Sequence, residues 1–153
     1  MKPRILVSAC LLGVNCRYDG GGKAAGGIAE LMAIAELIPV CPEILGGLPT
    51  PRVPSERAGE RVVTKDGRDV TDAFQRGAGE ALKLAELFGA ERALLKERSP
   101  SCGSGQIYDG SFTGGLVSGD GVTAALLKAR GIAVYGESRI QELIELLKED
   151  HKE

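Results

Sequence analysis

Cysteine is the residue type in this chain best suited to metal chemistry, and its positions follow a pattern. Cys10 comes just after a short aliphatic run, Cys41 ends a second run, and Cys102 follows a third by a few residues. Because ligands in parallel sheets bind beyond the carboxyl ends of the strands, we expect these thiols to meet at one sheet edge. No Cys-x-x-Cys pair occurs, which argues against zinc ribbons and thioredoxin-type motifs. The spacing therefore predicts a site assembled from loops.

Three thiolates that leave a coordination position open form a centre that can bind a substrate. The chain has 1 histidine, His151, which we expect in a solvated tail remote from the site, so thiolate-only ligation favours iron–sulfur over zinc. The alternative is that these cysteines are ordinary buried side chains, since free cysteine is often buried. The sequence leaves three roles open for Cys16: the last ligand, a catalytic thiol or a buried cysteine.

Other polar residues lie close to these cysteines in sequence. Glu43 follows Cys41 closely and would serve as a general base if burial raises its pKa. Ser99 and Ser101 precede Cys102 and are suited to hydrogen bonds with a substrate or a cluster sulfide. Each of the three also fits an ordinary solvated loop or turn.

The elements that must position these residues alternate along the chain. Short aliphatic runs predict buried strands at 4–9, 38–41, 90–96 and 132–135. Apolar periodicity predicts helices at 28–37, 71–88, 120–130 and from 138 onward. The apolar faces should be Ile28, Leu31, Met32 and Ala35 in the first helix, and Ile140, Leu143, Ile144 and Leu147 in the last. The segments 12–27, 43–54 and 97–120 are predicted to be loops.

Local signals refine these boundaries. Asp72 with Gln75, and Ser138 with Gln141, predict capping boxes, and Asp120 is expected to cap the third helix. Gly89 is expected to end its helix, and Asp66-Gly67 predicts the turn of a small hairpin over 61–70. The alternation predicts one α/β domain over 1–153, Rossmann-like, with a mostly parallel sheet of about four strands flanked by helices.

Composition limits the classes of function. The chain has 153 residues, of which 43% are hydrophobic, and a net charge of −2. It therefore lacks the basic excess of proteins that coat a DNA duplex, although a small ligand remains compatible. No stretch approaches the roughly 20 apolar residues that span a bilayer, and the run at 5–7 is too short for a signal-peptide core. We expect a cytoplasmic protein with reduced thiols.

Four segments taken together resemble a known family. They are Ser8 to Gly13 (SACLLG), Asn15 to Gly20 (NCRYDG), Cys41 to Arg52 (CPEILGGLPTPR) and Lys96 to Gly103 (KERSPSCG). In order and spacing they resemble the domain of unknown function 523, whose characterised members are thiouracil desulfidases. The similarity extends over essentially the whole chain.

This resemblance implies a [4Fe-4S] cluster held by Cys10, Cys41 and Cys102, with one iron open to the sulfur of a thiolated nucleobase or nucleoside. The implied reaction is a non-redox desulfuration in which Glu43 handles protons and Ser101 or Ser99 assists. It also implies substrate contacts from Cys16, Arg17, Tyr18 and Asp19. The sulfide acceptor and the substrate among thiouracils, thiouridines and their monophosphates stay open.

Two other classes of function compete with the enzyme. An iron–sulfur protein for sensing or electron transfer would need a fully ligated cluster, with Cys16 as the last ligand. A metal-free α/β nucleotide binder would carry reduced structural cysteines. The carboxylate and serines beside the expected ligands favour the enzyme, because a carrier needs neither.

Overall fold

The structure is a computed structural model that describes residues 2–151. The side chain of His151 and the residues after it lie outside the described part, and with them the prediction for His151. No helix in the described chain combines the length and apolarity needed to cross a membrane.

Four strands form a wholly parallel central sheet. They are β1 (Arg4–Ser8), β2 (Glu36–Val40), β5 (Arg92–Leu95) and β8 (Ala133–Gly136), in the order β2-β1-β5-β8. The central strands β1 and β5 are buried along nearly their whole length, as expected for strands that are covered on both faces. The predicted α/β fold with a parallel sheet is confirmed.

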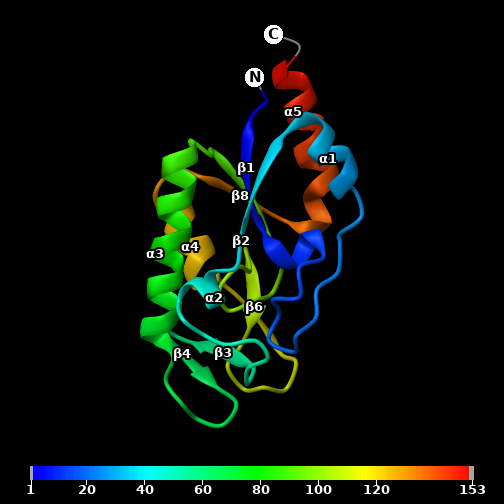
Figure 1. Ribbon diagram of the computed structural model, residues 1–153. Coiled ribbons are helices and arrows are strands. Elements are labelled where there is room, and N and C mark those ends of the chain that lie inside the picture. The colour runs from blue at the N-terminus through cyan, green and yellow to red at the C-terminus, as the bar shows by residue number, and fades with distance from the viewer. Residues whose placement is uncertain (1, 152–153) are drawn as a thin grey trace.

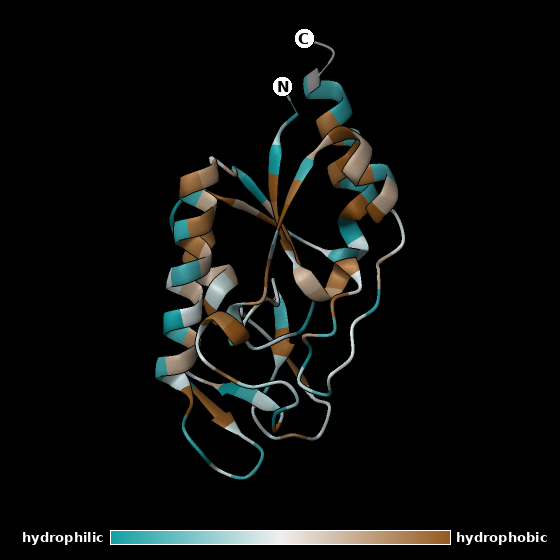
Figure 2. Cartoon of the chain, in the orientation of Figure 1, coloured by the Kyte–Doolittle hydropathy of each residue, from teal (hydrophilic) through white to brown (hydrophobic). Residues whose placement is uncertain are grey.

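Helices cover the two faces of this sheet (Figure 1). Ile5 and Val7 of β1 pack with α1 (Ile28–Ile34) and α5 (Ile140–His151). Leu6 points to the other face, where α3 (Thr71–Phe88) and α4 (Val122–Ala129) contribute the core. Figure 2 shows the strands as largely hydrophobic where they run between these helix layers. The carboxyl ends of the strands carry loops and short helical turns.

The first helix is shorter than its apolar pattern predicts. It ends at Ile34, because Ala35 is extended and β2 begins at Glu36 to pair with Arg4. Sheet pairing thus overrides the helical periodicity. Met32, expected on the buried face, is 56% exposed and that expectation is wrong. The apolar face predicted for α5 is buried as expected.

The predicted helix caps are mostly wrong, although the predicted stop at Gly89 is confirmed by its φ of 68°. Val70 is the N-cap of α3, and Asp69 instead accepts a hydrogen bond from the amide of Thr71 at 2.9 Å. The Ser138 hydroxyl donates to Glu97 at 2.7 Å, which ties the start of the last helical segment to the loop after β5.

The N-cap of α4 is Gly121, without a side-chain cap. The Asp120 carboxylate accepts from Gly105 and Lys128 instead of capping the helix. The polar side chains predicted to cap helices therefore form hydrogen bonds with other parts of the chain instead.

Two antiparallel hairpins extend beyond the carboxyl edge of the sheet. The first pairs β3 (Ser55–Ala58) with β4 (Arg61–Thr64). The predicted turn at Asp66-Gly67 is also present: Val63 and Asp69 form an antiparallel bridge across it, and the amide of Val70 donates to the carbonyl oxygen of Val62 at 2.9 Å. The second pairs β6 (Gln106–Tyr108) with β7 (Leu116–Ser118), inside a segment predicted to be loop. A short helix, α2 (Pro42–Leu45), also lies in a predicted loop. Figure 1 places β3, β4 and β6 below the sheet.

Candidate active site

Three strand ends deliver three cysteines to one place. Cys10 lies in the 3-10 helix η1 (Ala9–Leu12) directly after β1, Cys41 is the N-cap of α2 after β2, and Cys102 lies in the turn after β5. All three, together with Cys16, line a cavity of about 390 Å³, which we call the thiol cavity. The four cysteines are free thiols. The structure therefore brings together the thiols that the strand pattern placed at one edge.

Local hydrogen bonds fix the backbone around these thiols. The Ser8 hydroxyl accepts the amide of Lys96 at 2.9 Å and joins the ends of β1 and β5. The Ser99 hydroxyl accepts the amides of Ser101 and Cys102, each at 3.0 Å, and so shapes the turn that carries Cys102. A serine before a turn commonly makes such bonds.

Burial controls the protonation of the thiols. Desolvation, followed by the nearby Cys41, raises the pKa of Cys10 above its ordinary value. Desolvation, with Cys41 and Cys10 adding to it, raises the pKa of Cys16 to about 12, and desolvation raises the pKa of Cys102 to about 12. These thiols are therefore neutral near pH 7 in the metal-free chain, and metal binding has to displace their protons.

Glu43 lines the thiol cavity from α2. Its Oε1 accepts a hydrogen bond from Arg52 Nε at 3.1 Å, in an ion pair whose side chains are 19% and 6% exposed, respectively. Arg52 also donates to the carbonyl oxygens of Cys16 and Pro49. These contacts hold the Glu43 carboxyl group at a fixed place beside the thiols.

The two candidate serines lie in different environments. Ser99 lines the thiol cavity, and with two amides on its oxygen its hydroxyl proton remains free to donate. Ser101 is 1% exposed, is not among the cavity-lining residues, and shares a 2.8 Å hydrogen bond with Thr123. Ser101 also lowers the pKa of Cys102 through a hydrogen bond, a smaller effect than the burial that raises it. Ser99 thus faces the cavity, while Ser101 supports Cys102.

The loop between η1 and α1 contributes only part of what was expected. Arg17 and Tyr18 line the thiol cavity. Asp19 does not, and its carboxylate instead accepts the amide of Gly21 at 2.9 Å in a local turn. Cys16 is 3% exposed, and its carbonyl oxygen accepts from both Arg52 and the Cys41 thiol.

Several cavity residues carry no assignment from sequence. Arg52 and Lys96 lie inside the segments that resemble the family, but the sequence assigns no role to either residue. Glu56, Tyr108 and Phe112 come from the hairpins, and nothing in their spacing predicts that they face the cysteines. Only long-range contacts bring these hairpin residues to the site.

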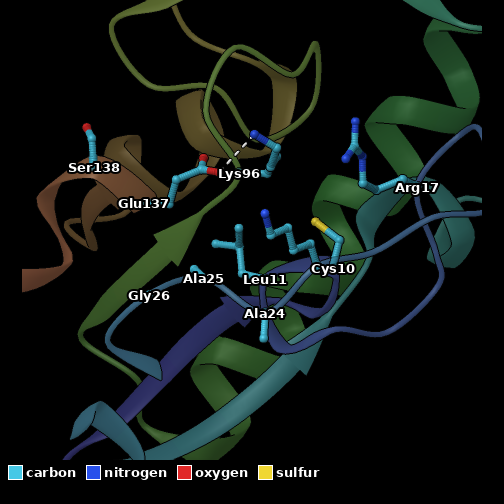
Figure 3. Close-up of a pocket in the computed structure, with 10 residues that line it drawn as sticks. Cys10, Leu11, Arg17, Ala24, Ala25, Gly26, Lys96, Glu137 and Ser138 are labelled. Carbon is cyan, nitrogen blue, oxygen red and sulfur yellow. Dashed lines mark hydrogen bonds and ion pairs between the residues drawn. The ribbon is translucent and has the colours of Figure 1, made fainter. Parts of the chain in front are cut away.

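A second cavity, of about 360 Å³, adjoins the thiol cavity and shares Cys10, Arg17 and Lys96 with it. Figure 3 shows Lys96 reaching toward Glu137, with Cys10 and Arg17 lining the same space. The Lys96 ammonium and the Glu137 carboxylate are 2.8 Å apart. Lys96 is thus fixed between the two cavities, where its charge partly offsets the factors that raise the pKa of Cys10.

The free cysteines of the thiol cavity are the ligand type that holds iron–sulfur clusters. Among the described residues, no group of three or more His, Cys, Asp or Glu side chains is placed to hold one metal ion. A single zinc ion needs its sulfur ligands about 2.3 Å from one point. A cluster instead spreads cysteine ligands over several iron atoms. Free thiols that surround a shared cavity match the second arrangement.

Fold and site together define an α/β protein whose parallel strands end at a thiol-lined cavity with the Glu43 side chain in its wall. The chain belongs to the 2-thiouracil desulfurase family, whose model matches residues 5–139. This range contains every cysteine of the chain and Glu43. The family resemblance inferred from the sequence is confirmed.

Two relatives are similar over nearly their full lengths. The solved structure of a [4Fe-4S]-dependent thiouracil desulfidase, TudS, has a TM-score of 0.91 and 51% sequence identity, covering 96% of this chain and 99% of that one. The uncharacterized protein YbbK of Bacillus subtilis (strain 168) is 43% identical over 150 residues, covering 92% of this chain and 99% of that protein.

Proposed function

We propose that this chain is an enzyme that removes sulfur from thiouracil or a related thiolated nucleobase or nucleoside, using a [4Fe-4S] cluster. The observation that carries the proposal is the meeting of free thiols, the Glu43–Arg52 pair and the Ser99 hydroxyl in one cavity. Family membership and the similarity to TudS support the same reaction. We also propose that the enzyme works in the cytoplasm, where thiols stay reduced.

We assign Cys10, Cys41 and Cys102 as the ligands, because each follows a different parallel strand and all line the thiol cavity. Cys16 stays outside this set. When bound, the cluster supplies an open iron that acts as a Lewis acid toward the thiocarbonyl sulfur. Arg17 and Tyr18 contact the substrate from the loop after η1.

Glu43 takes the proton of the attacking water. Its Oε1 is held by Arg52, which leaves Oε2 to face that water. The Ser99 hydroxyl donates a hydrogen bond to the substrate and stabilises the negative charge that develops during attack. Ser101 keeps Cys102 in place. Water and thiouracil give uracil and hydrogen sulfide, so the reaction balances without an electron donor.

The test is turnover of 2-thiouracil by anaerobically reconstituted protein, with uracil and sulfide measured together. We expect equal amounts of both products without added reductant. Glu43→Gln should retain its iron and lose activity by about 10²–10⁴-fold, the usual contribution of a general base. A loaded protein that turns over no thiolated base, nucleoside or nucleotide would instead support the sensing or electron-transfer alternative. Full activity in the Glu43 variant would remove the assigned base.

A further inference from the structure

A buried carboxylate outside the proposed reaction holds a loop against the thiol cavity. Glu56 of β3 is 8% exposed, and its Oε1 accepts the amides of Gly110 at 3.0 Å and Phe112 at 3.1 Å. Both amides belong to the segment that joins β6 to β7. A carboxylate is costly to bury unless it is hydrogen-bonded, so these amides compensate Glu56 and in return are fixed by it.

The segment held by Glu56 includes a residue in an unfavourable backbone conformation. Phe112 has a φ of 59°, in the left-handed region that bulky side chains rarely adopt. Strain of this kind persists only where surrounding contacts impose it, and such residues cluster at functional sites. The neighbours Ser111 and Thr113 are exposed, whereas Phe112 is half-buried. The fold therefore holds one aromatic residue in place at an otherwise exposed loop.

Phe112 lines the thiol cavity together with Glu43, Ser99 and the cysteines. Two other aromatic residues of the cavity differ from it: Tyr18 is 43% exposed, and Tyr108 lies in the regular strand β6. Among the described residues, Phe112 alone combines cavity lining, left-handed backbone and a buried carboxylate on its amide. The 390 Å³ of the cavity can hold a planar heterocycle beside such a ring.

We propose that Phe112 is the stacking residue that binds the flat pyrimidine ring of the substrate, and that Glu56 is the positioning residue that holds it there. This inference rests on the proposed function, because it assigns the recognition of that same substrate. Aromatic stacking recognises any planar base and leaves the thiocarbonyl free for the reaction. Phe112 is then responsible for ring affinity, while Glu43 and Ser99 serve the chemical step.

The test measures ring binding in the cluster-free chain, with uracil as the probe. Phe112→Leu, which keeps apolar volume but removes the aromatic face, should weaken uracil binding by roughly 5- to 150-fold, the range for losing one base stack. Phe112→Tyr should restore it. Upfield shifts of the uracil H5 and H6 protons should appear with wild type and be absent with Phe112→Leu. Dihydrouracil, which lacks the aromatic plane, should bind weakly and equally to both.

In the loaded enzyme, Phe112→Leu should raise KM for 2-thiouracil by a similar factor while kcat and iron content stay within twofold of wild type. Glu56→Ala should reproduce the rise in KM with the Phe112 side chain intact. Phe88→Leu, which alters a phenyl group at the end of α3 outside both cavities, is the matched control and should change neither.

Unchanged uracil affinity and KM in Phe112→Leu would overturn the stacking role while leaving the desulfuration intact. A fall in kcat or iron content with unchanged KM would overturn it as well. Wild-type protein that shows the stacking shifts with uracil but turns over no thiolated substrate would contradict the proposed reaction and not the stack.

Discussion

The cysteines differ at the scale of single residues in what their main chains do. Cys16 contributes a carbonyl oxygen that accepts from Arg52 and from the Cys41 thiol, and an alanine would keep that oxygen. We therefore expect Cys16→Ala to retain the cluster, whereas Cys10→Ala, Cys41→Ala and Cys102→Ala each lose it. Iron per chain and absorbance in the thiolate-to-iron charge-transfer region measure this. Loss of iron in Cys16→Ala would mean a fully ligated cluster, as a carrier requires.

Arg52 is expected to contribute to stability through its buried ion pair with Glu43. Its side chain is 6% exposed and holds Glu43 and the Cys16 carbonyl at once. Removing one partner of a buried pair leaves the other uncompensated, which typically costs about 3–5 kcal/mol. We expect Arg52→Gln to lower the free energy of unfolding of the cluster-free chain by about 3 kcal/mol, measured by urea denaturation.

A matched arginine on the surface controls for the loss of charge. Arg61 pairs with Asp69, and these side chains are 69% and 42% exposed. Such exposed pairs contribute up to about 1 kcal/mol, so Arg61→Gln should change stability little. Equal losses in the two variants would contradict the special role of the buried pair.

The position of α2, at the scale of elements, depends on a glycine contact with α3. A Cβ built at Gly77 would overlap the carbonyl oxygen of Pro42, and one at Gly46 would overlap that of Ala73. The two backbones are thus in direct contact, and α2 carries Glu43 directly after Cys41. Gly77→Ala should push α2 away from α3 and reduce both thermal stability and iron uptake.

A second glycine of α3, Gly79, provides the control. A Cβ at Gly79 meets no atom within 4 Å, so Gly79→Ala should leave iron uptake unchanged and stabilise the helix by up to about 1 kcal/mol. Circular dichroism melting and iron content of the two variants decide the matter. If both variants behaved alike, the glycine contact would not position the site.

The sequence predicts the elements whose signal is local. Buried aliphatic runs identify the strands. Gly89 ends α3 because the position after the helix has a left-handed backbone conformation, which glycine adopts readily. The hairpin of β6 and β7 escapes prediction, since its strands have 3 residues each and β7 is wholly exposed. Glu56 and Phe112 escape for another reason: they meet only after the two hairpins come together.

At the scale of the whole molecule, binding of a cluster at the thiol cavity would be coupled to folding. Cys10, Cys41 and Cys102 follow strands β1, β2 and β5, which are neighbours in the sheet order β2-β1-β5-β8. A cluster on these thiols would tie the three strand ends together, and a ligand that binds only the folded chain stabilises it. The protons that the cluster displaces make this stabilisation dependent on pH.

The pH dependence of stability should reverse its sign when the cluster is bound. In the cluster-free chain, burial raises the pKa of Cys102 from 9.0 to about 12, so its stabilising contribution is present below pH 9 and is lost as pH rises toward 12. The slope is about 1.4 kcal/mol per pH unit for this thiol. In the loaded chain the thiolates are already deprotonated, whereas the unfolded chain binds protons below pH 9, so stability should rise with pH up to that value.

Melting temperatures measured anaerobically between pH 6.5 and 10 test this reversal. The loaded chain should melt higher as pH rises from 6.5 to 9, and the cluster-free chain should melt lower as pH rises from 9 to 10. Cys102→Ser removes the titrating thiol with little change in volume, so in the cluster-free chain it should flatten the decline above pH 9. Parallel curves for loaded and cluster-free protein would show that the thiols do not exchange protons for metal, and would remove Cys102 from the ligand set.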